Sequence, residues 1–187
     1  NFRNPKINWM LQTSPGDVWV KKSVPTPRGK VIGGSSSING MVYMRGNPDD
    51  YNHWQQLGNK GWGFDDVLPY FKKSQNQKRG DDFYHGKGGP LWVSDAAEPH
   101  PIAEAYIKAG IESGYQFNPD FNGKNQEGFG HIQWTTKNGR RSSAATAYLN
   151  PAKKRKNLSV IPNAQVHKII FNGNRAVGVD YEIAGRR

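Results

Sequence analysis

A run of glycines and serines at residues 33–40 limits most strongly what this chain can fold into. The run follows a short apolar step, Val31-Ile32, and reads Gly33-Gly34-Ser35-Ser36-Ser37-Ile38-Asn39-Gly40. Adjacent glycines lack a Cβ, so another molecule can lie against the main chain and a positive φ costs little. Backbone N–H groups in such a turn, above all where a helix begins, attract anions such as a pyrophosphate. By itself, the composition is equally typical of an ordinary surface loop.

Length and composition indicate a folded but loop-rich chain. With 187 residues it can form one good-sized domain or parts of two. Hydrophobic residues make up only 35%, and 22 glycines and 12 prolines favour loops, whereas 8 Phe, 8 Tyr and 6 Trp argue against disorder. The absence of cysteine excludes disulfides, thiol chemistry and cysteine metal sites. We therefore expect a piece that packs against more protein, and the lack of an initiating Met favours a fragment or a processed product.

The chain is strongly basic, with a formal net charge of +11 and a pI near 9.8. Its positive charges are dispersed, and the one dense cluster is Lys153-Lys154-Arg155-Lys156. A solvated helix end explains this cluster better than a nucleic-acid groove, so we expect no nucleic-acid partner. A basic surface also attracts anionic cofactors or membranes, which leaves membrane association open. No stretch approaches the roughly 18 apolar residues of a membrane span, and the compartment is not indicated.

Several segments have the end signals of helices. Asn47 fits an N-cap, Pro48 the first helical position, and Gly58 the stop of a helix over Tyr51–Leu57. The other expected helices cover residues 66–74, 101–113 and 144–149, the last one capped by Ser142 or Ser143.

Strands are expected where apolar residues alternate or form short runs. Pro25-Thr26-Pro27 predicts irregular structure, and residues 74–89 predict a polar, glycine-rich, mobile loop. Asn172-Gly173 between apolar runs predicts a hairpin turn. The expected strands are residues 17–20, 90–94, 131–136, 158–161, 164–171 and 176–181.

A longer pattern surrounds the glycine–serine run. It begins at Arg28-Gly29-Lys30-Val31-Ile32 and ends at Met41-Val42-Tyr43-Met44-Arg45-Gly46-Asn47-Pro48. This pattern closely resembles the first signature of the glucose–methanol–choline oxidoreductases, FAD-dependent flavoproteins that oxidise alcohols. The likeness is strongest to the choline-dehydrogenase and glucose-dehydrogenase-like branches. Further matching residues follow in the family's order: Tyr51, Trp54, Gly58-Asn59, Gly61-Trp62, residues 65–71, Gly88-Gly89-Pro90-Leu91, Gly128-Phe129-Gly130, residues 138–145, Asn157-Leu158 and residues 176–181.

The resemblance implies a mixed fold class, α+β or α/β, with part of an FAD/NAD(P)-binding Rossmann-like domain and the start of a substrate-binding domain. Residues 1–89 would belong to the FAD-binding domain with its flavin-covering loops, residues 90–156 would begin the substrate-binding domain, and residues 157–187 would be return strands of the FAD-binding domain. The chain would be an internal fragment, and we expect it to be inactive alone.

The activity that the resemblance implies is oxidation of a CH–OH group by hydride transfer to FAD. The parent protein would be an alcohol, choline or glucose dehydrogenase or oxidase. Its substrate would be a choline-, sugar-, aliphatic- or aryl-alcohol-like small molecule, and a quinone or O₂ would accept the electrons.

The resemblance also assigns contacts to the cofactor. The glycine backbone would lie near the pyrophosphate of FAD, and the main chain of residues 39–42 would lie near the isoalloxazine ring. The Asn39 carboxamide and nearby N–H donors would stabilise the electron-rich reduced flavin. Some relatives carry a His before this Asn that bonds covalently to the flavin, so Ile38 implies noncovalent FAD. The implied cofactor-binding residues are Gly33, Gly34, Ser35, Asn39, Gly40, Met41, Val42 and Val166, the last through main-chain contacts to the adenine; an ordinary apolar strand residue is the alternative at Val166.

Other candidate residues have simpler interpretations. Arg140 or Arg141 would reach a phosphate, but we favour a structural Arg beside helix-capping serines. The 5 histidines lack metal-ligand spacing, and His131 fits a structural role better than a catalytic one. The run at 33–37 also lacks the second glycine of a Gly-x-Ser-x-Gly hydrolase motif.

Two parts of the family's machinery have no counterpart in this sequence. It contains no Gly-x-Gly-x-x-Gly dinucleotide loop, and the family's catalytic His lies beyond the matched region, so we expect no catalytic residue in this chain. The alternatives to a flavoprotein piece are a non-catalytic basic module that binds anionic polymers, or a degenerate homologue kept for structure.

Overall fold

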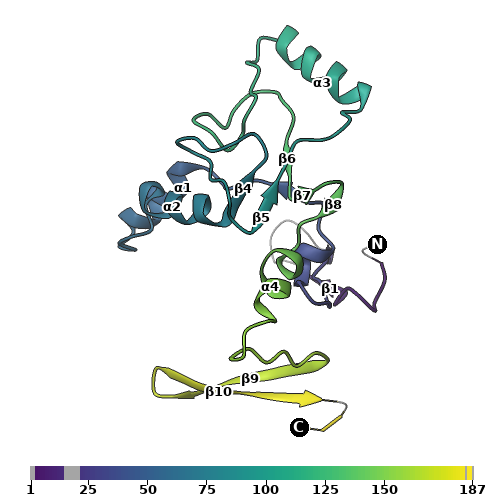
Figure 1. The fold of residues 1–187 in the computed structure, drawn as a ribbon, viewed down its shortest axis with the longest axis vertical. Helices are drawn as coiled ribbons and strands as arrows, with labels where there is room; N and C mark the ends of the chain where they lie inside the picture. The colour runs from purple at the N-terminus through teal and green to yellow at the C-terminus, as the bar shows by residue number, and fades with distance from the viewer. Residues whose placement is uncertain (1–2, 15–21, 184, 187) are drawn as a thin grey trace. The chain divides into compact units, whose positions relative to one another are not determined.

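The computed structural model describes residues 3–14, 22–183 and 185–186 of the chain (Figure 1). The chain divides into two compact units, unit 1 at Asn1–Pro151 and unit 2 at Ala152–Arg187. Short strands and helices alternate in unit 1, whereas unit 2 is dominated by one hairpin. The strand expected at residues 17–20 lies outside the described residues. The three-part division expected from the resemblance stays a prediction.

The strands of unit 1 pair in separate two-stranded pieces. Three pairs, β1 with β2, β3 with β6 and β7 with β8, are antiparallel, and β4 with β5 is parallel. The elements of unit 1 in chain order are β1 (Leu11–Gln12), β2 (Pro25–Thr26), the 3-10 helix η1 (Gly34–Ser37), β3 (Val42–Tyr43), α1 (Pro48–Gln56), α2 (Phe64–Ser74), β4 (Gln75–Gln77), β5 (Leu91–Val93), α3 (Pro101–Glu112), β6 (Gln133–Trp134), β7 (Thr136–Lys137), β8 (Arg140–Arg141), the π-helix η2 (Ala145–Leu149) and, at the boundary, α4 (Asn150–Ala152).

Helices α1 and α2 confirm two of the predicted helices; α1 begins at Pro48, the predicted first helical position, and α2 begins at Phe64, two residues before the range 66–74. The Asn47 side chain accepts a hydrogen bond from the Asp49 N–H at 2.9 Å, so it caps α1 as expected. The two helices pack through aromatic rings. The Tyr51 ring lies edge-on to Phe71, with 5.7 Å between ring centroids, and 6.3 Å from Phe64.

Two predictions of irregular or loop structure were wrong. Pro25-Thr26 forms β2, which pairs with β1 alone. A proline is tolerated in such an edge strand, because its lack of a backbone N–H costs no hydrogen bond on the unpaired side. Residues 75–77, expected within a mobile loop, form β4, which pairs with β5. The side chains of Gln75 and Gln77 are buried here, so polar composition did not indicate exposure.

Helix α3 confirms the predicted helix and packs against a later segment. The helix ends before Gly114, which has a φ of +94°. At Gly110, an added Cβ would lie 2.4 Å from the Phe129 ring, so the glycine permits the close approach of this ring. Tyr106 and Tyr115 flank the same ring, with centroids 5.3 and 5.1 Å from it.

The segment after α3 differs in detail from its prediction. The strand expected at residues 131–136 is divided into β6 and β7. The helix expected at residues 144–149 exists, but its main turn is of the π type and it continues as α4 through Pro151. The Ser143 Oγ accepts from the Thr146 N–H at 3.3 Å, as expected of a serine at a helix start.

Unit 2 consists mainly of a β-hairpin, β9 (Ala164–Asn172) and β10 (Arg175–Ile183). The predicted turn is confirmed, and Gly173 adopts a φ of +58° in it. The third strand expected at residues 158–161 is absent from the described structure. These residues are apolar, but Pro162 and the left-handed Asn163 separate them from β9 without giving them a partner strand.

The hydrophobic core of the described residues is small for a chain of this length. Its buried apolar members are Tyr43, Leu68, Val93, Ile107 and Ala147. Many large apolar side chains are exposed in both units, as expected of a piece that packs against further protein. No helix among the described residues is long and apolar enough to span a membrane.

Candidate functional site

The predicted glycine loop adopts the left-handed backbone that its sequence favours. Gly33 and Gly34 have φ values of +90° and +57°, and η1 begins directly after Gly33. A Cβ on Gly33 would lie 2.4 Å from the Ser37 Oγ, so that side of the loop is filled. At Gly34 and Gly40, by contrast, an added Cβ would meet no described atom within 4 Å. The loop is therefore packed on one side and open beside two of its glycines.

The serine hydroxyls of the loop hold the loop itself together. The Ser36 Oγ donates to the Gly33 carbonyl, and the Ser37 Oγ donates to the Ile32 carbonyl at 2.9 Å. The Ser35 Oγ accepts from the Gly29 N–H at 3.1 Å. These bonds fix the turn from within, so the main chain, rather than the hydroxyls, is what the loop offers to another molecule.

The second half of the loop is held by β6 and by its own side chain. The Thr135 N–H donates to the Met41 carbonyl at 2.7 Å, and Val42 pairs with Trp134 in the β3–β6 ladder. The Met41 N–H donates to the Asn39 Oδ1 at 3.1 Å. Met41 has a φ of +64°, a conformation that is uncommon for a residue with a side chain. These hydrogen bonds maintain that conformation.

Arg141 on β8 ties the two halves of the loop together. Its Nη1 donates to the Ser36 carbonyl at 3.0 Å and to the Asn39 Oδ1 at 2.6 Å. The Ala144 N–H adds a bond to the Ser36 Oγ at 2.9 Å. The guanidinium is thus bound to protein oxygens, which supports the structural interpretation of this Arg over a phosphate contact.

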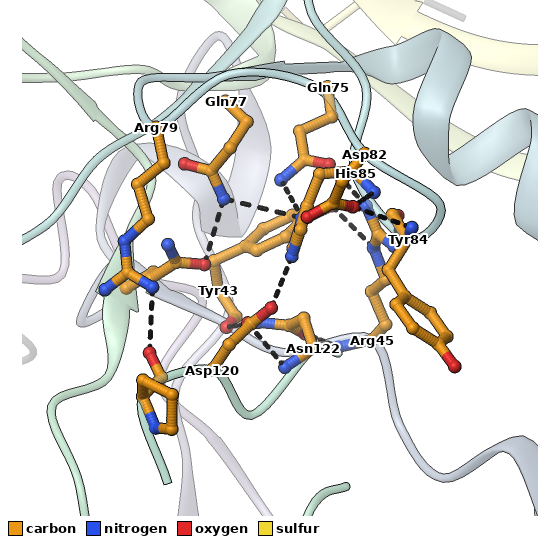
Figure 2. A network of polar contacts seen from close by, with 12 residues as sticks. Tyr43, Arg45, Gln75, Gln77, Arg79, Asp82, Tyr84, His85, Asp120 and Asn122 are labelled. Carbon is orange, nitrogen blue, oxygen red and sulfur yellow. Dashed lines mark hydrogen bonds and ion pairs between the residues drawn. The ribbon is translucent and has the colours of Figure 1, made fainter. Parts of the chain in front are cut away.

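The chain beyond β3 is anchored by a second arginine, Arg45, which is only 7% exposed (Figure 2). Its Nε donates to the Tyr43 Oη at 3.0 Å, and its two Nη groups donate to the Tyr84 carbonyl and the Gln75 Oε1. The backbone here is clamped by Asn122, whose Oδ1 accepts from the Arg45 N–H at 2.9 Å and whose Nδ2 donates to the Tyr43 carbonyl at 3.1 Å. Each of the three guanidinium nitrogens therefore donates a hydrogen bond, which offsets the cost of burying the charge.

His85 lies at the centre of the polar network in Figure 2 and is 4% exposed. Its Nδ1 lies 3.1 Å from the Gln75 Nε2 and 3.4 Å from the Gln77 Nε2, and its Nε2 lies 2.6 Å from the Asp120 Oδ2. Because the Gln75 Oε1 already accepts from Arg45 and from the Gly86 N–H, its amide nitrogen faces the ring as a donor. Nδ1 is then an acceptor, and the proton on Nε2 is donated to Asp120.

The surroundings of Asp120 favour its charged form. Burial alone would raise the pKa of this carboxyl, but hydrogen bonds from His85 and from the Asn122 N–H outweigh burial and lower the pKa below its ordinary value. Both ring nitrogens of His85 are engaged inside the network. Neither ring nitrogen of His85 is therefore free to contact a substrate, and the role of the His85–Asp120 pair is structural. Among the residues that the structure describes, the Gln77 Oε1 is buried and has no hydrogen-bond partner.

Sequence reasoning missed this network. His85 was considered only as a metal ligand, and Gln75 and Gln77 lay inside the expected loop. Gln75 and Gln77 occupy alternate positions, which places both side chains on one face of a strand, and this spacing is the one sequence signal that indicates a strand with a buried polar face. In the described parts of the chain, no group of three or more His, Cys, Asp or Glu residues could hold a metal ion.

The other predicted candidates are placed as follows. The seven predicted residues from Gly33 to Val42 lie in one continuous segment of unit 1, which runs from η1 to the start of β3. Val166 lies in unit 2, on β9 opposite Tyr181, with its side chain 49% exposed. The His131 Nε2 lies 2.9 Å from the Glu104 Oε1 of α3, a contact that fits the structural role expected of this His.

In unit 1, helices and short strands surround an accessible glycine loop. This arrangement is that of part of a cofactor-binding domain of mixed α and β structure. The sequence profile described as GMC oxidoreductase matches residues 19–187. The chain therefore belongs to the GMC oxidoreductase family, whose membership implies FAD as cofactor. Both the resemblance and the mixed fold class expected from the sequence are confirmed.

Individual relatives support the same assignment. The oxygen-dependent choline dehydrogenase of Brucella anthropi is 48% identical over 96% of this chain and 32% of its own length. Pyridoxine 4-oxidase from Mesorbium loti superposes on 95% of this chain and 36% of its own, with a TM-score of 0.88 and 32% identity. An FAD-dependent oxidoreductase from Chaetomium thermophilum superposes on 98% of this chain and 36% of its own, with a TM-score of 0.83 and 28% identity. The chain thus spans about a third of the length of the relatives it matches.

Proposed function

We propose that this chain is the flavin-facing part of a longer FAD-dependent oxidoreductase that oxidises the CH–OH group of a small alcohol. The observation that carries the proposal is the glycine loop at residues 33–42. It is open beside Gly34 and Gly40, and a hydrogen bond from Arg141 to Asn39 holds it in place. The family match covers this loop and favours an enzyme over a basic module that binds anionic polymers.

The residues of the loop fit the cofactor that the family implies. Gly34 and Gly40 leave space against the main chain, which a pyrophosphate or the edge of a flat ring can occupy. Ile32 and Val42 are each 47% exposed and supply apolar surface beside that space. Ile38, which precedes Asn39, has no group that can bond covalently to a flavin, so we propose noncovalent FAD. Gly33, Gly34, Ser35, Asn39, Gly40, Met41 and Val42 would hold it, and Val166 would contact its adenine.

When bound, FAD supplies the acceptor for the hydride that leaves the alcohol carbon. The residues of this chain hold that acceptor in place. Hydrogen bonds from Thr135 and Arg141 fix the loop before the cofactor arrives, so little ordering is needed on binding. We assign no proton-accepting role to the buried His85, since both of its ring nitrogens are engaged.

For the substrate, we propose choline first. The relative at 48% identity is named an oxygen-dependent choline dehydrogenase, and the same name favours O₂ over a quinone as the electron acceptor. Pyridoxine and simple primary alcohols are the next candidates, because a structural neighbour at 32% identity is a pyridoxine 4-oxidase.

Visible absorption of the full-length protein tests the proposal. The protein should be yellow, and anaerobic addition of choline should bleach the flavin band, whereas glucose, pyridoxine or ethanol should bleach it more slowly. Admitting air should restore the band if O₂ is the acceptor. A colourless protein that is retained on heparin in a salt-dependent manner would contradict the proposal and favour the polyanion-binding alternative.

A further inference from the structure

We propose that Arg141 is a positioning residue that fixes the Asn39 amide so that its N–H donors face the bound cofactor. The inference rests on the proposed function, because it assigns a role toward FAD to residues of this chain. Its basis is the set of contacts that join β8 to the glycine loop, all of which lie within unit 1.

The orientation of the Asn39 amide follows from the chemistry of its two neighbours. Its Oδ1 lies 2.6 Å from the Arg141 Nη1 and 3.1 Å from the Met41 backbone nitrogen. A guanidinium and a backbone N–H are donors only, so the group between them must be the amide oxygen. A flipped amide would place N–H groups against both donors. The nitrogen, Nδ2, is therefore forced to the opposite side.

That opposite side is the accessible one. Asn39 and Gly40 are both exposed, and an added Cβ on Gly40 would meet nothing within 4 Å. Within the described part of the chain, the Asn39 Nδ2 has no hydrogen-bond partner. Arg141 thus converts a flexible surface amide into an oriented donor at the open side of the loop.

An oriented N–H donor has a predictable effect on a flavin. Reduction adds electrons to the ring and makes its nitrogen and oxygen edge a stronger acceptor. A donor that is fixed in advance stabilises the reduced form more than the oxidised form, because no reorganisation is needed. Loss of the fixed amide should therefore shift the flavin midpoint potential to more negative values and weaken FAD binding.

The chain offers a matched control in Arg140. It precedes Arg141 on β8 and carries the same charge, but its side chain is exposed and makes no hydrogen bond or ion pair within the described residues. Arg140→Ala and Arg141→Ala remove the same charge from the same strand. A difference between the two variants therefore reports the contact with Asn39 rather than general electrostatics.

The test measures the flavin midpoint potential and the FAD dissociation constant of the full-length protein for the wild type and five variants. Arg141→Ala and Asn39→Ala should each make the potential more negative and raise the dissociation constant about tenfold, as expected for loss of an oriented hydrogen bond. The double variant should behave like either single one, because the residues act as a unit. Arg140→Ala should match the wild type. Asn39→Asp keeps an acceptor for Arg141 but has no N–H donor, so its potential should fall furthest.

The outcomes separate the two proposals. A wild type without flavin contradicts the proposed function. A wild type with flavin in which Arg141→Ala and Arg140→Ala have equal potentials contradicts the positioning role alone, as do additive effects of Asn39→Ala and Arg141→Ala. If Arg141→Ala does not fold, Arg141→Lys preserves the charge and part of the contact. That variant should give a potential between those of the wild type and Asn39→Ala, and a wild-type potential would contradict the role.

Discussion

At the residue scale, the structure depends on buried polar groups that are almost fully paired. Arg45, His85 and Asp120 come from segments far apart in the sequence, and one hydrogen-bond network next to β3 contains all three (Figure 2). A buried polar group contributes to stability only while its partner is present, and removal of the partner leaves the desolvation cost uncompensated. The network should therefore respond strongly to single substitutions.

Asp120→Asn should destabilise the protein by about 1–3 kcal/mol, because a neutral amide accepts more weakly from His85 and from the Asn122 N–H. Urea unfolding followed by tryptophan fluorescence measures the change. Asp81→Asn is the control, since Asp81 is exposed in the same region and its substitution should have little effect. Equal stability of the two variants would contradict a structural role for the His85–Asp120 pair.

The lowered pKa of Asp120 also predicts a pH dependence. Since its pKa in the folded protein lies below the ordinary value of 3.8, the charged form contributes stability that is fully present above that value. This contribution is lost as the pH falls through the lower, folded-state pKa. The stability difference between wild type and Asp120→Asn should therefore be constant above about pH 5 and shrink below about pH 4. A difference that grows on acidification would have the wrong sign.

At the element scale, the helices form where local signals agree. Helix α1 has a capping Asn, a proline at its first position, and acidic Asp49 and Asp50 in its first turn. Hairpin β9–β10 forms around its Asn-Gly turn, but leaves apolar side chains such as Ile169 and Phe171 exposed. A two-stranded hairpin is marginally stable alone, so unit 2 needs further protein around it.

The cap of α1 provides a prediction at this scale. Asn47→Ala should cost about 1 kcal/mol of stability, because the Asp49 N–H loses its acceptor. Asn47→Ser and Asn47→Asp keep an acceptor and should stay close to the wild type. Thermal unfolding of the three variants provides the measurement, and equal losses in all of them would show that the side-chain bond is not what matters.

Local patterns predict the elements better than they predict the site. Local signals mark the start of α1 at Asn47, the end of α3 at Gly114 and the hairpin turn at Gly173. Each signal depends only on residues nearby in the sequence, so both helices and the turn were predicted. Strand β4 was not, because the burial of its glutamines depends on contacts with distant residues such as Arg45, His85 and Gln133. The burial of Arg45 has the same cause, since its partners lie 30 and 39 residues away. A single sequence carries no local trace of such long-range pairing.

At the scale of the whole molecule, hydrogen bonds fix both the glycine loop and the chain that follows it. Arg141 and Thr135 fix the loop itself, and the Arg45 network fixes the chain that follows it. The loop is thus preorganised while its glycines remain accessible, which is what a site for a large flat cofactor requires. The small core and the exposed apolar side chains agree with a chain that spans about a third of its relatives.

Hydrogen exchange of the full-length protein, with FAD bound and with FAD removed, tests the central claim most directly. Backbone amides of residues 33–42 should exchange more slowly when FAD is bound, because the cofactor covers them. Amides of helix α3 at Pro101–Glu112 serve as the internal reference and should change little. Equal exchange at residues 33–42 in both states, with protection confined to other segments, would contradict the assignment of this loop to the flavin.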